Sequence, residues 1–397
     1  MTPRLRGVFR PIGRALRAVD RTAGRLGGRR SILLEARTPM NLAVLRPVFD
    51  RLLADSRVVV RFTGPERPDL AAAFAEIGLA DRVIPRSAAR WRRFDLYMNA
   101  DPWEAVKLRR VDKRLNFFHG VAGKYNLDCP SELPLGFDRY DMVAFPNEGR
   151  RAAYVAAGIV PAERAALIGY PKADALVAPD GDPRTRARAL GLDAGRPTVI
   201  FAPTFSAASA LNAAGEAIIE TLFASGCNVI AKLHDRSLDA DARYTGGIDW
   251  RERLRRYAGP HFLLAESGDS TPFVLASEVM VTDHSSIGFE FCAADRPVVV
   301  FDVPGLIEAA RINPDKVALL RSAAAVVATT AQLAEAIDEA LTSPHSRTAE
   351  RRRVANEVFH EPGTATERAL RLVYELIALP FSPPVAMPIE PRAARAA

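Results

Sequence analysis

Residues 279–290 read VMVTDHSSIGFE, and two kinds of local structure meet within this stretch. Residues 279–282 are apolar or β-branched, which is typical of a strand buried on both faces. Residues 283–286 are polar, and aspartate and serine are favoured at helix starts because their oxygens accept hydrogen bonds from the free N–H groups of a first turn. The stretch therefore predicts a buried strand whose carboxyl end opens directly into a helix.

Outward from this stretch, short β-rich runs alternate with segments of helical length. Strands are predicted over residues 31–36, 57–62, 94–99, 115–118, 140–145, 198–202, 228–233, 262–265, 279–282 and 298–302. The intervening helices include those predicted over residues 41–54, 68–79 and 148–157. Such alternation is typical of parallel βαβ units. We therefore predict an α/β protein with two doubly wound, Rossmann-like domains.

A passage rich in proline and glycine, residues 169–183, interrupts this alternation. We place the boundary between the two domains near residues 171–195, and predict an N-terminal domain over residues 31–180 and a C-terminal domain over residues 181–378. Residues 379–397 are predicted to form a loose tail. Two such domains leave a cleft between the carboxyl ends of their sheets, where open α/β folds bind ligands.

The N-terminal segment, residues 1–30, carries nine arginines and one acidic residue. Its apolar residues recur at the spacing of one helix face, and arginines occupy the other face. A basic amphipathic helix of this kind suits the headgroup layer of an anionic membrane. The alternatives are a helix packed on the protein body, an RNA-binding arm, or an organellar targeting peptide, which is usually rich in serine, whereas this segment has none. We expect a membrane-surface helix and no nucleic-acid partner.

The amino-acid composition limits the classes of protein to which the chain can belong. The 397 residues are 48% hydrophobic and 25% charged, which is ordinary for a globular protein, and the net charge of +7 suits anionic partners. Three cysteines lie scattered without metal-ligand or disulfide spacing, as expected in a reducing compartment. No apolar run has the length of a membrane span, and no secretory signal or nucleotide-binding glycine motif is present. We expect a cytoplasmic protein at the inner face of the membrane, with no metal and no cofactor.

A predicted strand over residues 115–118 delivers His119 into a turn that contains Gly120 and Lys124. Histidine is the side chain best suited to take a proton near neutral pH. A strand end before the histidine and a glycine after it direct the ring into the cleft. We therefore predict that His119 is a general base; in the alternative, it is only hydrogen-bonded within a loop.

Other polar residues also follow predicted strands and suit a phosphate. Thr204 offers a hydroxyl and a backbone N–H group after the strand over residues 198–202. Lys232 and His234 alternate late in the strand over residues 228–233, so both are predicted to point to one face. In the alternative, these are an ordinary turn and a solvated histidine.

The polar turn of the opening stretch suits a phosphate more specifically. Ser285 and Ser286 begin a helix, whose free N–H groups and dipole favour an anion, although a capped helix start needs no ligand. Glu290 interrupts the apolar helix that follows, and a buried carboxylate needs a partner. A ribose hydroxyl, an acceptor hydroxyl or an internal arginine would serve.

Taken in order, these segments resemble the CDP-glycerol glycerophosphotransferase family, which primes and polymerises teichoic acids and has a GT-B-type fold. The resemblance covers roughly residues 30–375 and is carried by HGVAGK (119–124), GYPK (169–172), FAPTF (201–205), KLHD (232–235) and TDHSS (282–286). A late glycine, alanine and arginine pattern is echoed by Gly363, Ala365 and Arg368.

The resemblance implies transfer of glycerol phosphate, or a similar polyol phosphate, from a CDP-activated donor to an acceptor hydroxyl of a cell-envelope polymer, capsule polysaccharide or lipid-linked glycan, with release of CMP. It implies that His119 and His234 are catalytic and that Gly120 and Lys124 lie on the acceptor side. The implied donor and phosphate-binding residues are Thr204, Lys232, Asp283, Ser285, Ser286 and Glu290.

Some positions depart from the family pattern. Residues 121–123 are Val-Ala-Gly where the family has Thr-Pro-Leu, His284 replaces a tyrosine and Asp235 replaces a proline. Residues 206–207 are Ser-Ala where the family has an arginine. Two alternatives stay open: a GT-B glycosyltransferase that uses an NDP-sugar, and a catalytically inactive membrane-associated scaffold.

Overall fold

The computed structural model describes residues 28–101, 105–118, 120–121, 136–177 and 181–382. Most of the basic N-terminal segment lies outside these ranges, as do His119, Lys124 and nearly all of the predicted tail.

The first sheet has six parallel strands in the order β2-β1-β3-β4-β5-β6. They are β1 (Arg30–Glu35), β2 (Val58–Thr63), β3 (Arg93–Asn99), β4 (Arg110–Phe117), β5 (Met142–Phe145) and β6 (Ala165–Leu167). Alternate residues of β1 enter separate apolar clusters, Ile32 and Leu34 in one and Leu33 in the other. Because both faces of β1 are buried, its residues 32–34 form a continuous apolar run.

The second sheet also has six parallel strands, in the order β12-β11-β10-β7-β8-β9. They are β7 (Thr198–Ala202), β8 (Asn228–Ala231), β9 (Phe262–Leu264), β10 (Val279–Thr282), β11 (Val298–Phe301) and β12 (Ala324–Val327). Strands β7 and β10 are adjacent, and the chain winds outward from them in opposite directions. This is the Rossmann order, with a topological switch point between β7 and β10.

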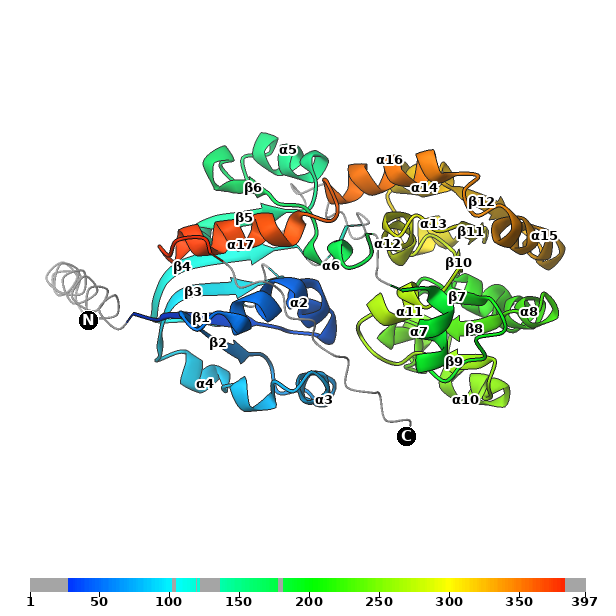
Figure 1. The fold of residues 1–397 in the computed structure, drawn as a ribbon, viewed down its shortest axis with the longest axis horizontal. Coiled ribbons are helices and arrows are strands. Elements are labelled where there is room, and N and C mark those ends of the chain that lie inside the picture. The colour runs from blue at the N-terminus through cyan, green and yellow to red at the C-terminus, as the bar shows by residue number, and fades with distance from the viewer. Residues whose placement is uncertain (1–27, 102–104, 119, 122–135, 178–180, 383–397) are drawn as a thin grey trace, which may run out of the picture.

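Helices flank both sheets, and we call each sheet with its flanking helices the first or the second lobe (Figure 1). The first lobe carries α2 (Pro39–Ala54), α3 (Pro68–Glu76), α4 (Arg86–Ala89), α5 (Glu148–Ala156) and α6 (Pro171–Asp174). The second lobe carries α7 (Pro183–Ala189), α8 (Ala210–Ala224), α9 (Ala242–Thr245), α10 (Trp250–Leu254), α11 (Thr271–Leu275), α12 (Ile287–Ala293), α13 (Leu306–Ala309), α14 (Pro314–Arg321), α15 (Thr330–Thr342) and α16 (Thr348–Phe359).

The last helix, α17 (Ala365–Leu376), returns to the first lobe, where it contacts α2 and α6 (Figure 1). The carboxylate of Asp174 caps it by accepting hydrogen bonds from the N–H groups of Gly363 (2.7 Å) and Thr366 (2.6 Å). The range proposed for the C-terminal domain, residues 181–378, therefore includes one helix whose contacts belong to the first lobe.

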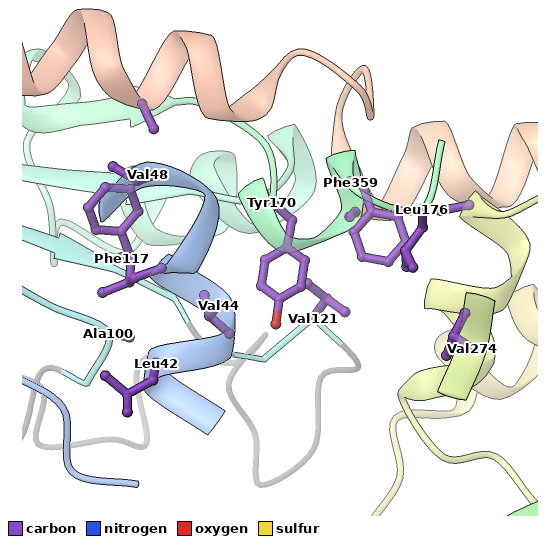
Figure 2. Packing of buried hydrophobic residues seen from close by; sticks show 14 of the residues in the cluster. Leu42, Val44, Val48, Ala100, Phe117, Val121, Tyr170, Leu176, Val274 and Phe359 are labelled. Carbon is purple, nitrogen blue, oxygen red and sulfur yellow. The ribbon is translucent and has the colours of Figure 1, made fainter. Parts of the chain in front are cut away.

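The chain crosses between the lobes twice, and the two crossings touch. Tyr170, at the first crossing, stacks on Phe359, at the second, with ring centroids 5.7 Å apart (Figure 2). Val121 and Leu176 belong to the same apolar cluster. The crossings are thus joined to the loop that follows β4.

The prediction of an α/β protein with parallel strands is confirmed, and every strand predicted from the sequence overlaps an observed one. Two short strands that are not predicted from the sequence, β6 and β12, pair with β5 and β11 at the sheet edges. Their sequences, AAL and AAVV, are rich in alanine, which has little preference for strands.

Candidate functional site

The two sheets face each other across the carboxyl ends of their strands. Pro39 follows β1 in the first lobe, and Gly268 follows β9 in the second. These residues approach so closely that a Cβ atom added at Gly268 would lie 2.6 Å from Cβ of Pro39. Ligands in such folds bind outside the carboxyl ends of the strands at the switch point, which in the second lobe lies between β7 and β10.

Asp283 holds the two switch-point strands together. The side chain is fully buried, and its carboxylate accepts hydrogen bonds from the N–H groups of Thr204 (2.6 Å) and Ala210 (2.7 Å). It therefore fixes the loop between β7 and α8. Each of the two carboxylate oxygens thus accepts a hydrogen bond from one backbone N–H group. Thr204 is buried at the start of the same loop.

The turn between β10 and α12 holds both candidate serines. His284 has a positive φ of 83°, which is uncommon for a residue with a side chain and costs on the order of 1–3 kcal/mol. Its ring Nε2 lies 3.3 Å from Nη2 of Arg321, which pairs with Asp302. Ser286 is the residue before the helix, but its hydroxyl makes no capping hydrogen bond. Ser285 and Ser286 are both partly exposed.

Lys232 lies just beyond the end of β8, which stops at Ala231. Its ammonium group donates to the carbonyl of Leu233 at 2.8 Å. Burial lowers its pKa because desolvation penalises the charged form; Asp235 opposes the shift and Lys172 adds to it. A phosphate beside it would favour the charged form.

His234 is exposed, unlike the partly buried Lys232. The prediction that the two side chains share a strand face is wrong, because neither residue lies in the strand. Nδ1 of His234 accepts a hydrogen bond from the N–H group of Arg236 (3.1 Å), so the proton of the neutral ring belongs on Nε2. The ring centroids of Phe205 and His234 are 4.2 Å apart, and the Arg236 guanidinium lies 5.3 Å from the Phe205 ring centroid.

Glu290 is buried, and its partner comes from the other lobe. Its carboxylate accepts hydrogen bonds from Nζ of Lys172 (2.7 Å) and from the hydroxyl of Ser270 (3.0 Å). The sequence leaves a ribose, an acceptor hydroxyl or an arginine as the partner, and the structure supplies a lysine and a serine. Glu290 therefore joins the lobes.

On the first lobe, the loop after β4 is anchored on both sides of His119. Phe118 packs against the rings of Phe145 and Tyr154 at 5.2 and 5.4 Å. The carbonyl of Gly120 accepts a hydrogen bond from Nη1 of Arg150, which is a buried residue of α5. These contacts hold Phe118 and Gly120 just beyond the carboxyl end of β4.

Sequence reasoning misses four basic residues at or beside this site: Lys172, Arg236, Arg321 and Arg150. Only Lys172 carried a usable signal, because it belongs to the GYPK stretch. Each of the other three meets a site residue through a side chain or a turn that the linear pattern does not specify. Within the described ranges, no group of three or more His, Cys, Asp or Glu residues could hold a metal ion.

Comparison with known proteins identifies the family and the fold of the chain. The family model for CDP-glycerol:poly(glycerophosphate) glycerophosphotransferase matches residues 103–375. No curated protein sequence matches the chain significantly. The wall teichoic acid polymerase TagF superposes with a TM-score of 0.61 at 13% identity, over 94% of this chain and 97% of that chain. A TagF variant with CDPG superposes with a TM-score of 0.63 at 15% identity, over 88% of this chain and 89% of that chain.

A putative UDP-N-acetylglucosamine 2-epimerase from Listeria monocytogenes has a TM-score of 0.56 at 12% identity, over 90% of this chain and all of that chain (100%). At such identities the structural likeness concerns the fold, which is GT-B-like. The family match spans most of the chain and includes the turn at residues 283–286 and the loops after β4, β7 and β8. The predicted resemblance is confirmed: the chain belongs to the CDP-glycerol:poly(glycerophosphate) glycerophosphotransferase family of transferases.

Proposed function

We propose that the protein transfers glycerol phosphate from CDP-glycerol to a hydroxyl group of a cell-envelope polymer or lipid-linked glycan, and releases CMP. One observation carries the proposal. The family match includes the turn at residues 283–286, which lies at the switch point of a Rossmann-ordered sheet with two partly exposed serines. Donor phosphates in this fold class bind at such a point.

The transfer forms one bond and breaks one. The acceptor oxygen attacks the phosphorus that carries glycerol, and the bond from this phosphorus to the oxygen of CMP breaks. His119 takes the proton of the acceptor hydroxyl, and CMP leaves with the bonding electron pair. Gly120 and Lys124 lie on the acceptor side of this reaction. Catalysis then depends on positioning and charge neutralisation, as is general for phosphoryl transfer.

The donor diphosphate is assigned to the second lobe. Ser285 and Ser286 donate their hydroxyls and the adjacent N–H groups, while Nε2–H of His234 donates from the loop after β8. The ammonium of Lys232 neutralises the negative charge of the diphosphate, and Thr204, in the loop after β7, lies beside these groups. Hydrogen bonds directed at a phosphate are strongest where water is excluded, as beside the partly buried Lys232.

The protein is further proposed to be cytoplasmic and to bind the inner face of the membrane. None of the helices in the described ranges is long and apolar enough to cross a bilayer. The first lobe instead exposes Trp91 (58%) with the guanidinium of Arg109 3.8 Å from its ring centroid. Three more exposed arginines lie nearby. Arg90 and Arg92 flank Trp91 in the sequence, and Arg110 begins β4, the strand that pairs with β3. Tryptophan and arginine together suit an anionic lipid interface.

This surface lies at the amino ends of the first sheet, where the basic N-terminal segment also joins β1. Replacing Trp91 and Arg109 by alanine in the full chain is expected to weaken binding to vesicles with anionic lipid about five- to tenfold, since each basic residue contributes about 1 kcal/mol near a charged surface. Vesicle flotation measures this. Val326→Ala, at an exposed apolar residue of the second lobe, is the matched control. Equal flotation of both variants would contradict this membrane surface.

The donor class is tested by the nucleotide that is released. Purified protein is incubated with a glycerol phosphate-terminated acceptor and either CDP-glycerol, CDP-ribitol or a panel of UDP-sugars. We expect CMP from CDP-glycerol. CMP from CDP-ribitol alone would change the polyol, whereas UDP from a sugar donor would make the protein a glycosyltransferase. Release of no nucleotide from any donor would contradict the proposed reaction.

A further inference from the structure

A buried group of three side chains joins the two lobes. Lys172 of α6 donates hydrogen bonds from Nζ to the hydroxyl of Ser270 (2.6 Å) and to the carboxylate of Glu290 (2.7 Å). The Ser270 hydroxyl in turn donates to the same carboxylate oxygen at 3.0 Å. Exposures of 2%, 3% and 6% place all three beyond bulk water. We call this group the interlobe triad.

Burial of the triad raises the free energy of the folded protein unless every member is present. Two charges have been removed from water, and the loss of one partner would leave the other charge buried without compensation. A hydrophobic pair could hold two helices together without this cost. An ionic group, however, favours one arrangement of its partners, because its hydrogen bonds require defined distances and directions.

The triad connects directly to both halves of the proposed site. Glu290 lies one helical turn after Ser286, so Lys172 holds the helix that begins with the phosphate-binding turn. On the other side, Lys172 follows Tyr170, which belongs to the same apolar cluster as Val121 of the loop after β4 (Figure 2). The segment from Tyr170 to Lys172 thus shares an apolar cluster with Val121 on the first lobe and forms an ion pair with Glu290 on the second.

A second contact also holds the two lobes at a defined separation. Gly268 lies two residues before Ser270, and its backbone meets Pro39 so closely that no Cβ atom can be accommodated without a shift. Pro39 begins α2, which itself contacts α6. The lobes therefore meet at two neighbouring points on one side of the cleft, one ionic and one steric.

We infer that Lys172 is a positioning residue: through Ser270 and Glu290 it sets the separation between the carboxyl end of β4 in the first lobe and the donor-binding turn, residues 283–286, in the second. This inference rests on the proposed function for the identity of the two sites. It assigns to Lys172 no contact with substrate. Since an error of about 1 Å between reacting groups can cost about 10²-fold in rate, the triad sets kcat.

The test compares Lys172→Met with Lys172→Arg in the full chain. Lys172→Met removes the charge at similar length and is expected to lower kcat about 10- to 100-fold while the KM for CDP-glycerol changes less than about threefold. Lys172→Arg keeps the charge and is expected to retain kcat within about threefold. Loss of both kcat and donor affinity in the same proportion would instead mean that Lys172 binds the donor, and would overturn the inference.

Two further variants keep the inference testable if Lys172→Met does not fold. Lys172→Met/Glu290→Gln leaves no buried charge unpaired, and is expected to fold yet keep the low kcat. Gly268→Ala forces the lobes apart by steric contact without touching the triad, and is expected to lower kcat with a normal thermal midpoint. Wild-type kcat in both variants would overturn the inference.

The matched control is Arg351→Met. Arg351 is also buried and ion-paired, with Asp295 at 2.9 Å, but both residues lie within the second lobe. This change is expected to lower the thermal midpoint while kcat stays within about twofold of wild type. An equal fall in kcat would show that any lost buried ion pair has the same effect, which would contradict a positioning role.

Small-angle X-ray scattering separates the two claims. If wild type releases no CMP from CDP-glycerol, the proposed reaction fails, but the lobe arrangement can still be measured. Lys172→Met/Glu290→Gln and Gly268→Ala are both expected to increase the radius of gyration relative to wild type and Arg351→Met. Identical scattering from all four proteins would overturn the docking role of the triad whatever the reaction is.

Discussion

Replacement of His119 by alanine is expected to lower the rate of CMP release by about 10²- to 10⁴-fold, the range that general base catalysis supplies. The acceptor hydroxyl then has no positioned group to take its proton. Donor binding should be preserved, because the proposed phosphate site lies on the second lobe. Steady-state kinetics with saturating acceptor, together with calorimetric titration of CDP-glycerol, measures both quantities.

His345→Ala is the matched control for this substitution. His345 is an exposed histidine in the loop between α15 and α16, on the second lobe. Its loss is expected to leave the rate unchanged. Equal rates for His119→Ala and wild type would contradict the base assignment, and a joint loss of rate and donor affinity would place His119 in the donor site instead.

Replacement of Asp283 by alanine is expected to have the largest effect on stability. The N–H groups of Thr204 and Ala210 would lose the carboxylate that now accepts their hydrogen bonds. A buried donor left without an acceptor costs about 1–3 kcal/mol, so two cost roughly 2–6 kcal/mol. For a lobe of this size each kcal/mol lowers the thermal midpoint by about 2–4 °C.

The same change is expected to raise the KM for CDP-glycerol in whatever protein remains folded, because the loop after β7 and the turn after β10 would lose their common anchor. Asp338→Ala, at an exposed residue of α15, is the control and should shift the midpoint by no more than about 2 °C. Calorimetry and donor titration on both variants decide the point. A stable Asp283→Ala protein would mean that the carboxylate does not organise the site.

The strands could be predicted because buried strands are composed of consecutive apolar or β-branched residues. Runs such as VMVT at residues 279–282 are apolar on both faces, and strands of this kind need no tertiary information to be recognised. Strand ends are less certain. The strand predicted over residues 228–233 includes Lys232 and Leu233, which follow the end of β8, because the alternation of residue types persists into the loop.

The candidate site could be predicted only in part, for a related reason. Parallel strands deliver the residues after their carboxyl ends to one edge, so Thr204 and the turn at residues 283–286 could be expected to meet. The direction in which each side chain then points depends on tertiary contacts. Asp283 turns inward to two N–H groups, and Glu290 finds its partner 118 residues away on the other lobe.

The crystal structure of the His119→Ala variant with CDP-glycerol would test the central claim most directly. The account predicts that the diphosphate lies at the carboxyl ends of β7 and β10, within about 3.2 Å of the Ser285 or Ser286 hydroxyl and of Nε2 of His234. A diphosphate bound on the first lobe, or one that contacts neither serine, would contradict the assignment of the donor site.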